Sequence, residues 1–452
     1  MFLNILTLSS VNIALPDIAA ELGFSAATLP WVISAYALTF AGFLLVGGRV
    51  ADLLGRRKIL VVGFGTFTTF TVVDALAKSP EMLIAARGLQ GIGAAITIPA
   101  ALGILAVTFG EGAERSRALA AFAAAGAVGF GFGLILGGVV TDALGWRWVF
   151  GLTAPPVAVL LALTFVLVPP DPDVRARGRI DLPGALSATA GLLCLVFALT
   201  NAGDVGWSAP VTLIAMGSGV ALLALFLTLQ ARVREPLMPF HVWALPNFAA
   251  VMAIAFFLYA AWTGVIFFLA LTLQKVLSYS PTEAGLALLP IAIGGYVGST
   301  LAGRLLPRTG PRRLLTLGLT LYITGIVLMT FIDSGSGYWP LIFAAVTLVI
   351  AGNSLTFVSA TATALAHSTA GEESLLGGLF NTSVQVGGGL GLAVVSAVAA
   401  TRIAPGASGD ALLPGYHAAF WTAAAIAAAG LAATVLFVRE TPSTAGAVAL
   451  QR

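Results

Sequence analysis

The feature that most limits the folds open to this chain is a regular succession of long apolar segments. We count fourteen, each long enough to cross a hydrocarbon core of roughly 30 Å as a helix. Open sheets leave backbone groups unpaired in lipid, so the sequence predicts an all-α membrane protein with fourteen transmembrane helices. The predicted spans are residues 1–22, 28–50, 59–77, 81–106, 118–141, 149–168, 183–201, 209–230, 246–275, 282–303, 314–332, 339–365, 375–400 and 416–438.

Composition supports a membrane environment and narrows the function classes. Only 9% of the residues are charged and 59% are hydrophobic, whereas soluble domains hold about 25% charged residues. The single cysteine, Cys194, excludes an intrachain disulfide. There is no GxxxxGK[ST] phosphate loop and no Cys/His cluster. We therefore expect a protein that is not an enzyme, with no cofactor, no metal ion and no nucleic-acid partner.

The basic residues are distributed unevenly between the two sides of the predicted membrane. Seventeen of the 22 Lys and Arg residues fall after even-numbered helices or in the C-terminal segment. The opposite loops hold Lys78, Arg147, Lys275 and Arg402, while Arg87 lies inside a span. By the positive-inside rule both termini are predicted to be cytoplasmic. The excess of Arg over Lys and the richness in Ala and Gly suggest a bacterial inner (cell) membrane.

A charged stretch, "GGRVADLLGRRKIL" at residues 47–60, interrupts this apolar pattern. We interpret it as a short cytoplasmic loop between helices 2 and 3. One interpretation is that its basic residues only fix the cytoplasmic side of the loop, as the positive-inside rule requires. However, Asp52 is acidic, which topology does not require, and Gly48 and Gly55 permit close helix approach and a tight turn. Arg56 and its basic neighbours can also contact anionic lipid headgroups.

The same stretch recurs later in the chain as "AGRLLPRTGPRRLL" at residues 302–315. The aligned pairs include Gly55 with Gly310 and Arg57 with Arg312, while Pro307 stands opposite Asp52. An offset of eight helices indicates parallel six-helix repeats with one inserted helix pair. We therefore predict an N-terminal bundle over 1–168, a linker with inserted helices 7 and 8 over 169–235, and a C-terminal bundle over 236–452.

Several motifs in order resemble the major facilitator superfamily, and most closely its fourteen-helix drug:proton antiporter branch. The loop stretch "GGRVADLLGRRK" resembles the superfamily's signature between helices 2 and 3. The motifs "WVISAYAL", "RGLQGIGAA", "GFGFGLILGG" and "WRWVF" resemble stretches of helices 2, 4 and 5 and the segment that follows. Two further stretches, "SYSPTEAGLALLP" and "NTSVQVGG", resemble parts of helices 10 and 13.

The resemblance implies roles for the charged residues. Gly48, Asp52, Gly55 and Arg56 would form a conformational latch in which Asp52 caps a helix of the other half. Arg87 would take part in proton coupling. An intramembrane Arg needs a partner, and Asp74 on helix 3 lies at a comparable depth. The alternative for both side chains is snorkelling to the outer interface.

One position departs from the branch's pattern. The branch usually carries an Asp in helix 1, nine residues before the Pro of a "VNVALP"-like stretch, and here Thr7 occupies that position. The departure weakens the expectation of a cationic substrate.

Two further sets of residues complete the predicted site. The helix 5 motif supplies glycines for close packing, although Leu134 replaces its usual Pro, so no kink follows. These glycines are Gly129, Gly133, Gly137 and Gly138. Neutral polar and aromatic side chains would line the substrate cavity, with packing or an interfacial position as the alternative for each aromatic. The cavity candidates are Asn12, Trp31, Tyr36, Gln90, Tyr259, Trp262, Asn353, Asn381 and Gln385.

These patterns predict a proton-coupled secondary active exporter of hydrophobic drugs or antibiotics that works by alternating access. The partners expected are a lipophilic small-molecule substrate, protons and membrane lipids, and we expect a monomer. A substrate-specific exporter of a natural product or lipid is the close alternative, favoured by Thr7 in place of the acid. An importer and a non-transporting membrane scaffold are the remaining, less favoured readings.

Overall fold

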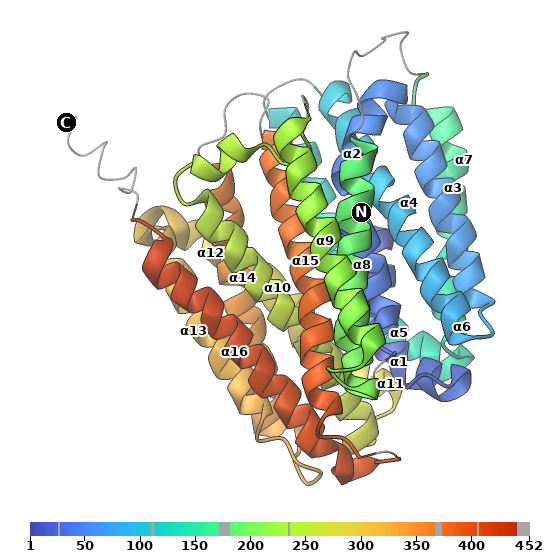
Figure 1. The fold of residues 1–452 in the computed structure, drawn as a ribbon, viewed down its shortest axis with the longest axis vertical. Coiled ribbons are helices and arrows are strands. Elements are labelled where there is room, and N and C mark those ends of the chain that lie inside the picture. The colour runs from blue at the N-terminus through green and yellow to red at the C-terminus, as the bar shows by residue number, and fades with distance from the viewer. Residues whose placement is uncertain are drawn as a thin grey trace. The chain divides into compact units, whose positions relative to one another are not determined.

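A computed structural model describes residues 1–25, 28–109, 113–170, 181–233, 236–366, 373–404 and 406–440. Every regular element in these ranges is helical, with no strand among them. Twelve helical segments there are long and apolar enough to cross a membrane. Two more helices contain shorter apolar stretches, Trp31–Leu44 and Val128–Leu144. The expected all-α membrane fold is therefore confirmed (Figure 1).

The chain divides into two compact units. Unit 1 comprises residues 1–239 together with 280–286, a short segment that interrupts the second unit in the sequence. Most of it is coloured blue to green in Figure 1. Its helices are α1 (Phe2–Leu22), α2 (Trp31–Leu54), α3 (Arg56–Ala75), α4 (Pro80–Thr108), α5 (Ala113–Leu144), α6 (Arg147–Gly151), α7 (Ala154–Leu167), α8 (Leu182–Val205), α9 (Pro210–Arg232) and nearly all of α11 (Pro281–Ala287).

Unit 2 comprises residues 240–279 and 287–452. Its main helix pairs are α10 with α15, α10 with α16 and α13 with α14. Its elements are η1 (Phe240–Ala244), α10 (Phe248–Leu271), η2 (Thr272–Val276), α12 (Leu289–Thr309), α13 (Pro311–Met329), η3 (Tyr338–Ile342), α14 (Phe343–Leu365), α15 (Glu373–Ala400), η4 (Gly409–Leu412) and α16 (Leu413–Phe437).

The expected loop between helices 2 and 3 is nearly absent, which corrects the sequence interpretation. Helix α2 continues to Leu54 and α3 begins at Arg56, so Gly55 alone separates them. Gly55 has φ +104°, a conformation that residues with a Cβ rarely adopt. The second copy of the repeat makes the same kind of turn. Gly310, with φ +76°, is the single residue between α12 and α13.

Two predicted spans are interrupted where the sequence suggested continuous helices. The span expected at 282–303 consists of α11 and α12, separated at Leu288 just before Pro290. The span expected at 149–168 consists of α6 and α7, separated just before Pro155. Proline lacks a backbone N–H and is tolerated in the first turn of a helix, so each helix restarts there.

Of the two helices predicted to be an insertion, α8 packs onto α2 within unit 1 and α9 packs against α8. Gly42 of α2 lies directly against the side chain of Thr189, and a Cβ at Gly42 would collide with it. The indole Nε1 of Trp31 donates to the hydroxyl of Thr200 at 3.1 Å. Asp181 caps the start of α8, because its carboxylate accepts a hydrogen bond from the backbone N–H of Gly184 at 2.9 Å.

Candidate functional site

The candidate site centres on Arg87, whose side chain is completely buried in unit 1. Its Nε donates to the backbone carbonyl of Val32 at 2.9 Å, and its Nη1 donates to the side-chain oxygen of Gln90. The guanidinium carbon lies 4.5 Å from the ring centroid of Tyr36 and 5.9 Å from that of Phe150. Hydrogen bonds and cation–π contacts therefore offset part of the cost of burying this cation.

Glycines of the "RGLQGIGAA" stretch make these contacts possible. A Cβ at Gly91 would lie 2.5 Å from the backbone oxygen of Tyr36, and one at Gly93 would lie 2.7 Å from the backbone nitrogen of Phe67. Only glycine permits such close backbone approach. Helix α4 therefore lies tightly against both α2 and α3, which brings Arg87 within reach of groups on both neighbours.

Asp74 is the second charged group of the site. It lies in the last turn of α3, is completely buried, and neither carboxylate oxygen has a hydrogen-bond partner within the described residues. Nη2 of Arg87 is also buried and unpartnered within the same ranges. Within the described residues, Arg87 and Asp74 do not form a direct ion pair. Their charges nevertheless interact electrostatically. Complete burial of both side chains within the protein favours this electrostatic pairing over snorkelling to the interface, and their role in proton coupling stays a prediction.

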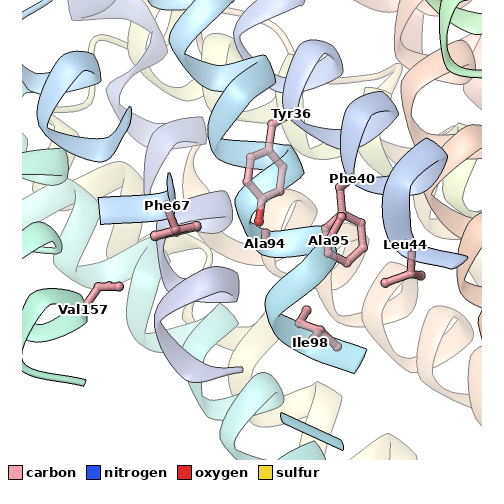
Figure 2. Close-up of a cluster of buried hydrophobic side chains, with 8 residues drawn as sticks. All are labelled: Tyr36, Phe40, Leu44, Phe67, Ala94, Ala95, Ile98 and Val157. Atoms are coloured by element: carbon pink, nitrogen blue, oxygen red, sulfur yellow. The ribbon is translucent and has the colours of Figure 1, made fainter. Parts of the chain in front are cut away.

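Tyr36 belongs to a cluster of buried hydrophobic side chains (Figure 2). Phe40 of α2 stacks on Tyr36 with ring centroids 6.1 Å apart, and Phe67 of α3 and Ala94 of α4 belong to the same cluster. Electrostatic interactions are stronger in such low-dielectric surroundings than in water. A change in the charge of Asp74 would therefore strongly change its electrostatic interaction with Arg87.

The residues of the predicted latch lie around the turn at Gly55. Gly48 lies within α2, where a Cβ would make only an ordinary contact with Pro99. Nη1 of Arg56 donates to the backbone carbonyl of Gly103 at 2.7 Å, so this side chain ties the start of α3 to α4. The side chain of Asp52 lies outside the described residues, and the latch remains a prediction.

The four glycines of the helix 5 motif contact two different elements of unit 1. A Cβ at Gly129, Gly133 or Gly137 would lie 2.5 to 2.6 Å from a backbone oxygen of α1. Gly138 faces the other way, onto the backbone of Pro281 at the start of α11. The glycines thus give α5 one smooth contact with α1 and another with the 280–286 segment.

The cavity candidates of unit 1 have partners inside the bundle. Nδ2 of Asn12 donates to the backbone oxygens of Leu8 at 3.0 Å and Ser9 at 3.4 Å. Trp31 donates to Thr200 of α8 as described above, while Tyr36 and Gln90 are buried beside Arg87. These four side chains are therefore engaged within unit 1.

Among the cavity candidates of unit 2, Asn353 carries a polar atom without a partner in the described residues. Tyr259 lies 5.6 Å from Phe357, measured between ring centroids, and Trp262 is buried on α10. Asn353 of α14 is buried and its Nδ2 has no partner within the described residues. Asn381 and Gln385, one turn apart on α15, are half-buried. A buried amide donor without a partner is costly, which makes Asn353 available to a ligand.

Unit 1 also holds an apolar pocket of about 190 Å³ between α1, α5, α6 and α7. Phe2, Phe132, Leu136 and Trp148 are among its lining residues. None of the predicted cavity residues lines it, whereas Gly137 of the helix 5 motif does. No group of three His, Cys, Asp or Glu side chains in the described ranges could hold a metal ion.

Two polar contacts of unit 1 were not predicted from the sequence. Thr71 accepts a hydrogen bond from Gln90 at 2.7 Å, and its position one turn before Asp74 was the available signal. Thr282 donates to Asp142 at 2.7 Å and joins α11 to the end of α5. Beside it, Glu283 and Ser280 form a reciprocal capping box, so Glu283 is a first-turn acid of α11.

These observations define a multi-pass helical membrane protein in which the same sequence repeat makes the same glycine turn in each of two units. The family pattern described as the Major Facilitator Superfamily matches residues 1–234 and 251–451. The chain belongs to this superfamily, so the predicted membership is confirmed.

Similar proteins include exporters and resistance proteins of actinomycetes. The chain is 37% identical over 421 residues to the puromycin resistance protein pur8 of Streptomyces alboniger, covering 90% of this chain and 83% of that protein. It is 36% identical over 405 residues to the cephamycin export protein CmcT of Amycolatopsis lactamdurans, covering 88% and 82%. These proteins are named as transport and resistance proteins rather than as enzymes.

A solved structure with the same fold is a bacterial homologue of the human lysosomal transporter Spinster in an inward-facing, unoccupied conformation. The TM-score is 0.69 at 17% identity, and the match covers 98% of this chain and 96% of the other. The likeness shows the superfamily's helical fold.

Proposed function

We propose that this chain is a proton-coupled secondary active exporter of hydrophobic drugs or antibiotics in the bacterial cell membrane. The observation that carries the export function is its 37% identity, over 90% of its length, to a puromycin resistance protein. A cephamycin export protein and the multidrug resistance protein Stp of Mycobacterium tuberculosis are also among its relatives. These names refer to chemically different compounds, which supports a small-molecule substrate. We further propose that the substrate is lipophilic and that the transporter is a monomer.

Proton coupling is supported by Asp74 and Arg87. Both are buried in predicted membrane spans, and each has polar atoms without a partner among the described residues. Uncompensated ionisable groups at such positions are costly, and in transporters they mark proton relays. In the proposed cycle Asp74 takes up and releases the coupled proton, while Arg87 responds to the change of charge.

The finer architecture is part of the same proposal. Twelve helical segments and two shorter apolar stretches within the described ranges support fourteen crossings. The proposal also includes cytoplasmic termini and a division of the chain into 1–168, 169–235 and 236–452. Gly48, Asp52, Gly55 and Arg56 would latch one access state. Bundle side chains with unused polar groups, Asn353 foremost, would contact the substrate during alternating access.

The experiment that tests this function uses the full chain in proteoliposomes. Accumulation of a fluorescent lipophilic dye is followed after a pH gradient is imposed, with and without a protonophore. Accumulation that requires the gradient and collapses with the protonophore is the expected result. Dye movement that ignores the gradient would refute proton coupling.

A substrate-specific exporter of a natural product or lipid is a second candidate, and Thr7 favours it. The hydroxyl of Thr7 donates to the backbone oxygen of Leu3 at 2.9 Å, so this position supplies no carboxylate for a cation. Comparing neutral, anionic and cationic probes in the same assay separates the candidates. Broad transport that includes cations supports the drug exporter, while transport confined to one neutral or anionic class supports the alternative.

A further inference from the structure

Both polar atoms of the Gln90 amide have a hydrogen-bond partner within unit 1. Its Oε1 accepts from Nη1 of Arg87, and its Nε2 donates to Oγ1 of Thr71 at 2.7 Å. A guanidinium can only donate, so it fixes which end of the amide faces Arg87. The side chain is completely buried. Gln90 is therefore built into the bundle rather than presented to a transported molecule.

Thr71 fixes the direction of this hydrogen-bond chain. Its hydroxyl donates to the backbone oxygen of Phe67 at 2.6 Å, which leaves its oxygen to accept from Gln90. The chain therefore runs from Arg87 through Gln90 and Thr71 to the backbone of α3. Every link lies in the bundle interior, where a satisfied polar network is rigid and a broken one is costly.

Most of the Arg87 guanidinium is held by partners of this kind. Nε is held by Val32, Nη1 by Gln90, and one face by the ring of Tyr36. Within the described residues, only Nη2 is left buried without a partner. The arrangement holds the cation near Asp74 but not in a direct ion pair with it.

Two further titratable or charged groups lie on helices that pack against α3, and both have partners of their own. On α2, Tyr36 stacks against Arg87. On α6, Arg147 pairs with Glu21 of α1 and donates to the backbone oxygen of Ala77 at 2.9 Å. Arg87 is therefore the cation whose position decides how easily the Asp74 carboxylate binds a proton.

We propose that Gln90 and Thr71 are positioning residues for proton coupling, because they hold Arg87 away from a direct ion pair with Asp74. The inference rests on the proposed function, in which Asp74 carries the proton. A direct ion pair favours the ionised carboxylate, so the proton would then bind only at lower pH. Without the Gln90–Thr71 arm, Nη1 of Arg87 is released and can turn towards Asp74.

The test compares transport by the wild type with that of Thr71→Val and Gln90→Leu. Initial rates of dye accumulation in proteoliposomes are measured across a range of pH at a constant pH gradient. Both variants are expected to move the half-maximal pH of transport downward by roughly one unit, the lower end of the effect of a nearby opposite charge on a carboxyl group. The KM for the dye should not change, because neither residue contacts it.

Two controls separate positioning from packing. Thr71→Ser keeps the hydroxyl and should restore the wild-type pH profile. Thr97→Val removes a buried hydroxyl on α4 that donates to its own helix, to Gly93 at 2.7 Å, and should leave the profile unchanged. If Gln90→Leu does not fold, the pH profile of the nearly isosteric Thr71→Val alone decides whether the inference holds.

An unchanged half-maximal pH in Thr71→Val would overturn the inference. So would a raised KM with an unchanged profile in Gln90→Leu, which would mark Gln90 as a substrate contact. Failure of the wild type to accumulate dye under the gradient is a different result, because it refutes the proposed function itself.

Discussion

The guanidinium of Arg57 donates to the backbone carbonyl of Phe165 at 2.7 Å, in the last turn of α7. Carbonyls in the last turn of a helix have no partner within the helix, and this end carries a partial negative charge. Arg57 therefore satisfies a backbone acceptor and compensates the helix dipole. The contact joins the start of α3 to the end of α7 in unit 1.

Arg312, the residue aligned with Arg57 in the sequence repeat, makes the equivalent contact in unit 2. Its Nη2 donates to the backbone carbonyl of Val435 at 2.7 Å, in the last turn of α16. Each unit thus uses one Arg, two residues after a glycine turn, to tie one helix start to the end of another helix. A basic residue that served membrane topology alone would not need this geometry.

Arg57→Ala and Arg312→Ala are expected to destabilise the protein by about 0.5–1.5 kcal/mol each, because each removes a hydrogen bond to a helix end. Thermal unfolding in detergent measures the loss as a lower apparent Tm. Arg402→Ala, which removes an exposed arginine after α15, is the matched control and should leave Tm unchanged. Equal Tm values for all three variants would contradict the capping role.

Gly55→Ala and Gly310→Ala are expected to destabilise the protein by roughly 1–2 kcal/mol, because each residue has a positive φ that a Cβ disfavours. Gly303→Ala is the control, because Gly303 lies within α12 and an added Cβ would meet no atom within 4 Å. The same Tm measurement applies. A lower Tm for Gly303→Ala than for the two turn variants would refute the explanation.

The sequence was sufficient to predict the helices but not their ends. Apolar length determines whether a segment can span a bilayer, and composition alone reveals it. Helix ends depend on single residues, so Gly55 shortened an expected loop to one residue, and prolines divided two expected spans. The number of crossings stays a prediction where the apolar stretches of α2 and α5 are short.

The candidate site was only partly predictable for a different reason. Arg87 and Asp74 stood out because charges are rare in spans. Thr71 did not, because helices carry many hydroxyls and only tertiary packing selects the one that meets Gln90. Trp31 was assigned to the cavity by residue type, yet its indole bonds to Thr200, 169 positions away in the sequence.

Gly137→Ala is expected to destabilise unit 1 by about 1–3 kcal/mol through overpacking. The new Cβ would lie 2.6 Å from the backbone oxygen of Ser10, which cannot move without shifting α1. Gly65→Ala on α3 is the control, because nothing lies within 4 Å of the added Cβ and alanine favours helix. Thermal unfolding should therefore separate the two variants, and equal stability would argue against tight α1–α5 packing.

Asp74→Asn is expected to abolish pH-gradient-driven dye accumulation, because an amide cannot take up and release the coupled proton. Counterflow of dye between equal concentrations, which needs no gradient, should persist, since the fold and the substrate contacts remain. Glu81→Gln, at an exposed acid in the first turn of α4, is the matched control and should accumulate dye normally. Gradient-driven accumulation by Asp74→Asn at the wild-type rate would remove Asp74 from the coupling mechanism, whereas loss of counterflow as well would indicate a structural role instead.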